Sequence, residues 1–469
     1  MENKKIKRER IPGMVSASAV LGICILTLVG GILVFQLDTA IALLLATLII
    51  VLYGIKNGIP YLDIQKHMMD TLAGVINVLV YIALIGALIG AFMSAGTIPY
   101  IICVGLKMIS PGIFLPLTLI MCSVVSLCTG SGMSSTCTVG VAFIGIAEGM
   151  GISLPLTAAA VACGAYLGDK QSPVSGFAAF ISGICQVEIL KHCKSMLFTT
   201  VPAFLLSLMI FSILGCSYRD LSLDGEKIST LTNGLESAFH FSPVTILPLI
   251  LILVLIMLRI PSLPAIVLGM FVAVLVAILY QGIEVQQALD TLMNGFHVKS
   301  DLEFVQEIAD RGGMISMGST LLVIMMALCM GGAMDRTHII EIVAGKLANS
   351  VRTQKQLVIS TVFLTIFGHI ATSHSLSSAV ISVNALGKKY DELGVDRAVL
   401  SRSISDGSVV LSPIVPWCPD AMVCAQALGV ATLVYAPYYF MIYGTIVAAV
   451  VCACSGIGMK FHKAKEYSK

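Results

Sequence analysis

Charged residues are scarce in this chain of 469 residues, at 12% of the total, whereas a soluble globular domain carries about a quarter. This shortage excludes a soluble enzyme, a nucleic-acid-binding protein and a disordered chain. The 28 Lys and Arg nearly balance the 26 Asp and Glu, so no field of one sign favours a polyanionic partner such as nucleic acid. The HExxH and GxSxG motifs are also absent. We therefore expect no enzyme activity and no cofactor other than coupling ions.

Paired cysteines are lacking as well. The 14 cysteines form no CxxC motif, and the closest two, Cys452 and Cys454, stand in an apolar run. Cysteines spread singly through apolar segments are typical of small packing residues. We expect reduced thiols rather than disulfides or zinc ligands.

Long apolar runs are abundant, because 57% of the residues are hydrophobic and the mean hydropathy is +0.96. Each crossing of a lipid bilayer needs about 20 apolar residues, so the length allows roughly ten to twelve transmembrane segments. The first ten residues hold five Lys or Arg, and apolar spans at 11–35 and 39–53 follow. A cleaved signal peptide would lead into a polar domain instead. The basic ends predict cytoplasmic termini in a multi-pass protein of the plasma membrane.

Weak internal matches occur in the same order in both halves of the chain. They pair residues 69–72 with 289–292, 129–135 with 372–378, and 172–174 with 412–414. Such duplications in membrane proteins are commonly inverted repeats, with substrate bound where the repeats meet. A passive channel is the other reading, but no repeated filter loop is visible. We expect N-terminal helices at 1–58, a first repeat at 59–217, a polar linker at 218–242, a transmembrane pair at 243–282, a second repeat at 283–458 and a basic cytoplasmic tail at 459–469.

Polar and helix-breaking residues interrupt the apolar sequence of the first repeat at two places. Residues 129–138 hold two glycines and six hydroxyl residues, which indicates a re-entrant hairpin tip or broken helix; close packing of small residues is the other reading. Residues 164–175 place charges in apolar surroundings, where they commonly mark an ion or proton pathway; a solvated turn is the other reading. The candidate binding residues here are Thr129, Ser131, Ser134, Ser135, Asp169, Lys170 and Ser172.

The second repeat carries two counterparts. Residues 368–378 contain two histidines, of which His374 is a candidate proton-linked switch; a histidine hydrogen-bonded between helices is the commoner case. Residues 401–419 centre on Asp406, with Gly407 and two prolines breaking the helix around it; an acid at a solvated helix end is the other reading. The candidate residues in this half are His374, Ser377, Ser378, Asp406 and Ser412.

Two of these segments resemble the signatures of the NhaC-type sodium/proton antiporter family. Residues 164–175, GAYLGDKQSPVS, are similar to the family pattern GA-[YF]-[FL]-GDK-x-SP-[LV]-S, and residues 400–417 resemble LSR-x-x-ED-x-x-x-x-SP-[LI]-IPW. The resemblance implies an all-α polytopic fold of two inverted repeats with re-entrant hairpins and broken helices. It also implies Na⁺ and H⁺ as coupling ions, with Na⁺ at Asp169 and Asp406. The family includes exchangers of malate and lactate.

The chain departs from that family where oxygen ligands are expected. The usual DTTN is GFAA at 176–179, the acid before Asp406 is Ser405, the Asn after Pro-Trp is Cys418, and the hairpin Trp is Met133. Hard cations prefer oxygen ligands, so sodium coupling is weakened or lost. We predict a proton-coupled cation antiporter. The alternative is an exchanger or symporter of a small organic anion or amino acid; a homodimer is left open.

Overall fold

The computed structural model describes residues 13–74, 76–219, 225–258, 260–297 and 312–459. The basic stretch expected at the N-terminus and nearly all of the basic tail lie outside these ranges, as do residues 220–224 of the expected polar linker. Within the described residues the fold is all-helical. The first helices are α1 (Met14–Leu33), α2 (Thr39–Lys56), α3 (Tyr61–Gly74), α4 (Ile76–Ser94) and α5 (Thr97–Met108).

The first helical unit begins at α3 and includes a hairpin and a broken helix. A group of connecting helices follows it. The hairpin and broken helix comprise α6 (Pro111–Thr129), α7 (Gly132–Ser135), the π-helix η1 (Thr136–Gly140), α8 (Val141–Met150), α9 (Leu154–Gln171), α10 (Gly176–Ile184) and α11 (Ile189–Cys216). The connecting group is α12 (Gly225–Ala238), η2 (Pro243–Ile246), α13 (Leu247–Met257) and α14 (Ser262–Leu279).

The second helical unit repeats this order of elements. It comprises α15 (Val285–Asn294), η3 (Ile315–Met317), α17 (Gly318–Arg336), α18 (Ile339–Ser350), α19 (Gln354–Thr372), α20 (Ser375–Glu392), α21 (Arg397–Gly407), η4 (Ser412–Ile414), α22 (Pro419–Leu428), α23 (Thr432–Tyr435), η5 (Ala436–Tyr438) and α24 (Phe440–Ser455). The hairpin formed by α19 and α20 is again followed by a broken helix, whose two halves are α21 and α22.

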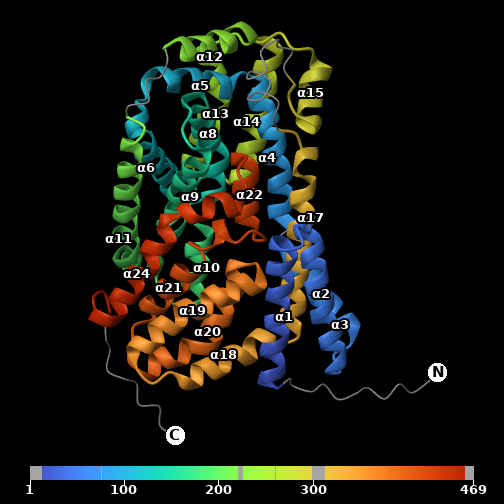
Figure 1. Ribbon diagram of the computed structural model, residues 1–469, viewed down its shortest axis with the longest axis vertical. Helices are drawn as coiled ribbons and strands as arrows, with labels where there is room; N and C mark the ends of the chain where they lie inside the picture. Colours follow the sequence, from blue (N-terminus) through green and yellow to red (C-terminus); the bar gives the residue numbers. More distant parts are fainter. Residues whose placement is uncertain (1–12, 75, 220–224, 259, 298–311, 460–469) are drawn as a thin grey trace, which may run out of the picture.

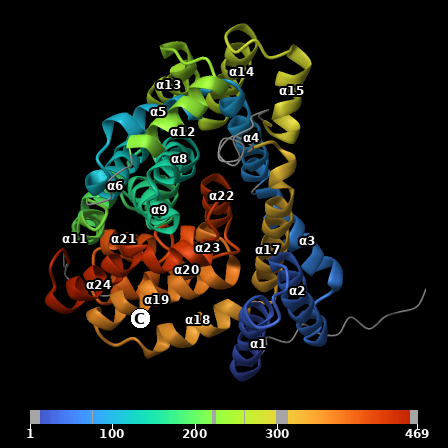
Figure 2. The same ribbon diagram turned by 45° about the horizontal axis from the view of Figure 1, so that its top comes forward.

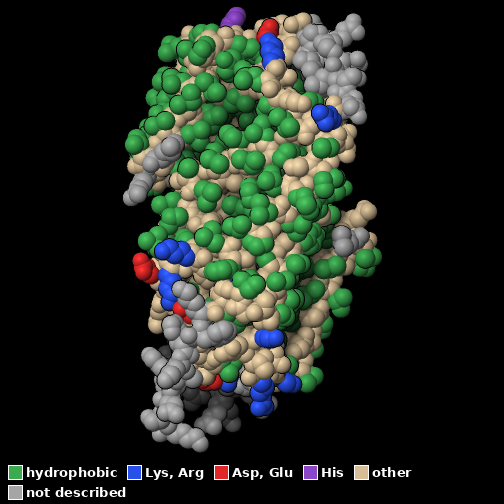
Figure 3. Space-filling view, turned by 90° about the vertical axis from the view of Figure 1, so that its left-hand side faces the viewer, with side chains coloured by type: hydrophobic (Ala, Val, Ile, Leu, Met, Phe, Trp, Pro, Cys, Tyr) green, Lys and Arg blue, Asp and Glu red, His purple; other side chains and the backbone are tan. Residues whose placement is uncertain are grey.

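Eight of the described helical spans are long and apolar enough to cross a membrane, and eleven are if each bent pair forms one span. Large apolar side chains on several of them face outward, among them Leu205, Phe363 and Val447. Figure 3 shows hydrophobic side chains over most of one face, with Lys and Arg gathered mainly near its lower end. Exposed apolar surface of this extent is typical of contact with lipid. The prediction of an all-α multi-pass membrane protein is confirmed.

The two units interlock. In Figures 1 and 2, α6–α9 lie above α19–α21, and α22 extends from the lower group into the upper one. Helix α10 of the first unit packs against α20 and α21, and α22 of the second packs against α7, η1 and α8. Each broken helix therefore sends its second half into the other unit.

A second reciprocal exchange involves the short helices α3 and α15. Helix α3 packs against α17, and α15 packs against α4. Glycines allow both close approaches: a Cβ on Gly90 of α4 would lie 2.4 Å from the Thr291 carbonyl oxygen, and one on Gly332 of α17 would lie 2.7 Å from the His67 carbonyl oxygen. This recurrence supports a duplicated unit. The inverted orientation of the repeats, and the division of the chain proposed from the sequence, stay predictions.

Candidate functional site

The two hairpin tips have the same backbone conformation. Gly130 (φ 66°, ψ 24°) and Ser373 (φ 60°, ψ 15°) are left-handed, and the next residues, Ser131 (φ −143°) and His374 (φ −144°), are extended and begin the following helix. A left-handed residue ends a helix by the αL cap geometry. Each hairpin thus reverses in two residues. The first tip lies against the break between α9 and α10, since a Cβ on Gly130 would lie 2.8 Å from the Ser175 backbone nitrogen.

Helix α9 brings polar side chains to that break. Tyr166 and Lys170 are four residues apart and therefore lie on one face, with Asp169 beside them. Pro173 ends the helix since it supplies no backbone donor and disfavours a helical residue before it. The Ser172 hydroxyl donates to the Leu127 carbonyl oxygen at 2.8 Å, which ties the break to α6.

Lys170 forms a buried ion pair with Asp406. The distance from Nζ to Oδ1 is 2.6 Å, and the two side chains are 0% and 1% exposed. The Thr199 hydroxyl donates to the same carboxylate oxygen at 2.9 Å. The pair joins α9 of the first unit to α21 of the second, where charges without a partner would be costly. Lys170 and Asp406, which the sequence predicted as separate site residues, therefore bind each other.

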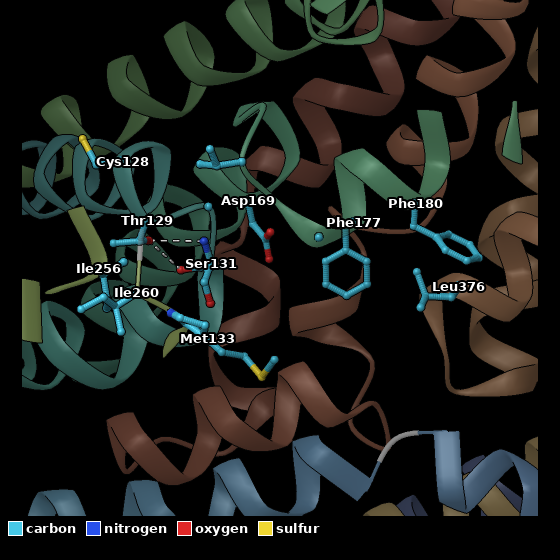
Figure 4. Close-up of a pocket in the computed structure, with 14 residues that line it drawn as sticks. Cys128, Thr129, Ser131, Met133, Asp169, Phe177, Phe180, Ile256, Ile260 and Leu376 are labelled. Atoms are coloured by element: carbon cyan, nitrogen blue, oxygen red, sulfur yellow. Dashed lines mark hydrogen bonds between the residues drawn. The ribbon is translucent and has the colours of Figure 1, made fainter. Parts of the chain in front are cut away.

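Asp169 points elsewhere, into a cavity. Its side chain accepts a hydrogen bond from the Ser175 hydroxyl at 2.6 Å, and the residue is 4% exposed. The cavity has a volume of about 960 Å³. Figure 4 shows Asp169 facing it together with Phe177 and Met133. Its lining comes from the first hairpin tip, the break and neighbouring helices: Cys128, Thr129, Gly130, Ser131, Met133, Asp169, Val174, Gly176, Phe177, Phe180, Ile256, Ile260, Pro261 and Leu376.

Among the described residues that line this cavity, Asp169 is the one carboxylate. Thr129 and Ser131 are the lining hydroxyls, and they also bind each other, since the Ser131 backbone N–H donates to Thr129 Oγ1 at 3.3 Å (Figure 4). From the second unit the wall is formed by Leu376 and by neither of its neighbours His374 and Ser377. The site is thus acidic at one point and mainly apolar elsewhere.

Several predicted site residues are absent from the described lining of the cavity and form hydrogen bonds with the backbone or with a neighbour. Ser135 donates to the Cys122 carbonyl oxygen at 3.0 Å, and Ser378 donates to that of Ser375 at 2.8 Å. The Ser134 N–H donates to Ser131 Oγ at 3.2 Å, while Ser377 Oγ and His374 Nδ1 are 3.5 Å apart. These contacts stabilise the tips. A direct role for these residues in binding stays a prediction.

A further buried acid, Asp420, was missed by the sequence analysis. It lies in the first turn of α22, is buried, and accepts hydrogen bonds from the Ser412 hydroxyl and, at 3.2 Å, from the Tyr166 hydroxyl. Ser412, predicted to line the site with Asp406, contacts Asp420 instead. The available signal was an acid in an apolar run directly after Pro419, where a helix starts and its N-terminal dipole favours negative charge.

The Gly130→Ala substitution tests whether the tip needs glycine where it packs against Ser175 and Val174. A Cβ at Gly130 would lie 2.8 Å from the Ser175 backbone nitrogen, and φ is positive, so we expect a loss of about 1–3 kcal/mol in the free energy of unfolding. Ser373→Gly is the matched variant, because glycine relieves rather than creates strain there. Thermal unfolding of both purified variants measures the effect; an unchanged Gly130→Ala protein would contradict this account of the tip.

A polytopic helical protein with broken helices and a buried carboxylate facing a cavity near its interlocking units has the construction of a secondary transporter. The chain matches the Na⁺/H⁺ antiporter family over residues 164–457, and it belongs to that family. It is 31% identical to the malate-2H⁺/Na⁺-lactate antiporter of Bacillus subtilis, with 96% of each chain covered. It is 33% identical to an uncharacterized Na⁺/H⁺ antiporter of Haemophilus influenzae, covering 97% of this chain and 99% of that one.

A further relative is the Na⁺/H⁺ antiporter NhaC of Bacillus subtilis, 32% identical over 87% of this chain and 90% of the relative. The resemblance inferred from the two signatures is therefore confirmed. Both signatures fall within the matched range of the family, and so do Asp169, Lys170, Asp406 and Asp420. The chain is a secondary transporter.

Proposed function

We propose that this transporter exchanges protons for a cation at the Asp169 carboxylate. The observation that carries the proposal is that Asp169 supplies the one carboxylate among the described cavity-lining residues. The other three buried acids among the described residues have partners: Asp406 pairs with Lys170, Asp396 pairs with Lys191, and Asp420 accepts hydrogen bonds from Ser412 and Tyr166. A proton and a cation compete for one anionic group, so binding of either releases the other.

The Lys170–Asp406 pair has a different role in this scheme. It joins α9 of the first unit to α21 of the second, at the residue that follows Asp169. Each charge of the pair is neutralised by the other. Buried ion pairs contribute little net stability but strongly disfavour arrangements that separate them. The pair therefore restricts the motions of the two units to those that keep α9 and α21 together. Alternating access then comes from movement around this contact.

An exchanger of small carboxylates or amino acids is the second candidate. It is favoured by the 31% identity to a protein named as a malate-2H⁺/Na⁺-lactate antiporter. The described lining, however, contains no Lys or Arg, and Lys170 is bound to Asp406. A carboxylate would enter only with Asp169 protonated, which again makes Asp169 the coupling group.

The orientation in the membrane and the assembly are proposals from composition and surface. The lower end in Figure 3 carries most of the visible Lys and Arg. By the positive-inside rule this end is cytoplasmic, in the plasma membrane, with both termini on the same side. Homodimer formation and the lack of an enzyme activity stay predictions from the sequence.

Proton flux in proteoliposomes tests the function. The full-length protein is reconstituted with a trapped pH-sensitive dye and an acidic interior, and NaCl, LiCl or KCl is added outside. We expect saturable alkalinisation of the interior with at least one cation, since outward proton movement accompanies cation entry. Malate, lactate and arginine are added in parallel. Proton movement with carboxylates alone would favour the second candidate, and flux that never saturates would contradict both.

A further inference from the structure

The cavity that Asp169 faces has aromatic and apolar side chains in its wall as well as a charged group. Phe177 and Phe180 are three residues apart on α10 and so share one side of that helix. Both line the cavity, together with Met133 and Leu376. Figure 4 shows the Phe177 ring directed into the space beside the Asp169 carboxylate. An aromatic ring, rather than a further oxygen-bearing side chain, therefore lies beside the carboxylate.

Besides Asp169, two of the described lining residues have side-chain oxygens, Thr129 and Ser131. Hard cations such as Ca²⁺ are held by about six oxygens. Asp169 Oδ1 accepts the Ser175 hydrogen bond. Thr129 Oγ1 and Ser131 Oγ each accept a backbone N–H of the tip, from Ser131 and Ser134. In the described part of the chain, no group of three or more His, Cys, Asp or Glu is placed to hold a metal ion. A bare Na⁺ would leave much of this cavity unfilled.

Charge and volume both fit a larger cation. The described lining residues carry one acid and no Lys, Arg or His, so the described wall has a single negative charge, at Asp169. Its volume of about 960 Å³ is far greater than a bare ion requires, and drug-sized ligands occupy pockets of roughly 300–1,000 Å³. Phenyl rings attract cations through their π faces and also bind apolar surface.

We propose that the cation exchanged for protons is an organic ammonium ion with an apolar or aromatic body. The ammonium group binds the Asp169 carboxylate, and the body packs against Phe177, Phe180 and Leu376. This inference rests on the proposed proton exchange at Asp169 and specifies its cargo. The protonated carboxyl gives up its proton as the ammonium binds, so one proton is released for each ammonium bound and no covalent bond to carbon changes.

Calorimetric titration of the purified full-length protein tests the cargo class. Phenylethylammonium chloride is compared with 3-phenylpropionate, which has the same ring and nearly the same length but a negative charge, and with NaCl. We expect phenylethylammonium to bind at least about tenfold more tightly than Na⁺, and 3-phenylpropionate not to bind. The affinity for phenylethylammonium should fall as pH is lowered, because protons occupy Asp169.

Ring variants separate the cargo class from the exchange itself. Phe177→Ala should weaken phenylethylammonium binding by roughly 5- to 30-fold and leave Na⁺ binding unchanged. Phe177→Leu keeps apolar volume without the ring and serves if the alanine variant is unstable; it should also weaken binding. Phe271→Ala, the same truncation at an exposed phenylalanine of α14, is the matched control and should change neither affinity.

Three results would overturn the inference: tighter binding of Na⁺ than of phenylethylammonium, binding of 3-phenylpropionate, or unaltered phenylethylammonium affinity in both Phe177 variants. If Na⁺ binds and displaces protons in the wild type but not in Asp169→Asn, while phenylethylammonium fails to bind, the cargo class is wrong and the exchange at Asp169 stands. If no cation displaces protons from the wild type, both proposals fall.

Discussion

Asp169→Asn should abolish cation-driven proton flux. Asparagine keeps the volume of the side chain and an oxygen that accepts the Ser175 hydrogen bond, so the fold should persist. The variant has no carboxylate to bind a proton or pair with a cation. Removing one partner of a buried charge contact costs about 3–5 kcal/mol, which corresponds to more than 100-fold in affinity. Initial rates of flux in proteoliposomes give the measurement.

The control for this variant is Asp38→Asn. Asp38 is an exposed N-cap whose side chain accepts the Ala40 N–H at 2.8 Å, and asparagine is an equally good cap. Flux through Asp38→Asn should equal that of the wild type. Flux of normal size through Asp169→Asn, in protein shown to be inserted and folded, would contradict the assignment of Asp169 as the coupling group.

Lys170→Met should strongly destabilise the protein. It leaves the Asp406 carboxylate buried without its ion-pair partner, and an uncompensated buried charge costs about 3–5 kcal/mol in the free energy of unfolding. The double variant Lys170→Met with Asp406→Leu removes both charges and should recover most of that loss, because a buried pair contributes little net stability. Thermal or denaturant unfolding in detergent measures all three proteins.

Lys107→Met is the matched control for this series. Lys107 pairs with Glu236 at 2.9 Å, but the two side chains are 57% and 46% exposed, and exposed pairs are worth at most about 1 kcal/mol. A loss in Lys170→Met no larger than that in Lys107→Met, or a double variant less stable than the single one, would contradict the account of the buried pair.

Much of the architecture was predictable, because it follows from local composition. The apolar runs predicted the spanning helices, and the glycines and serines of 129–138 predicted a break in helical structure. The tip of the second hairpin was found through its match to the first, although Ser373 holds the left-handed position that Gly130 holds in the first. Its conformation is sustained by the surrounding tertiary packing rather than by the residue type.

The pairing of side chains across the two units was not predictable from the sequence. Lys170 and Asp406 stand far apart in the chain, and their contact depends on how α9 and α21 pack. The same packing turns Asp169 into the cavity and leaves Lys170 outside its described lining. Asp420 was overlooked because its partner Tyr166 is far away in the sequence and meets it only in the folded protein. Local pattern identifies polar residues in membrane helices, but tertiary contacts decide which of them remain available to a substrate.

The most direct test of the account is the number of protons released when a cation binds. Purified wild-type and Asp169→Asn proteins are titrated with a saturating cation in weakly buffered solution, and the change in pH is recorded. We expect up to one proton per bound cation from the wild type, in the pH range where Asp169 takes up its proton, and none from the variant. Equal proton release from both proteins would show that the exchange takes place at another group.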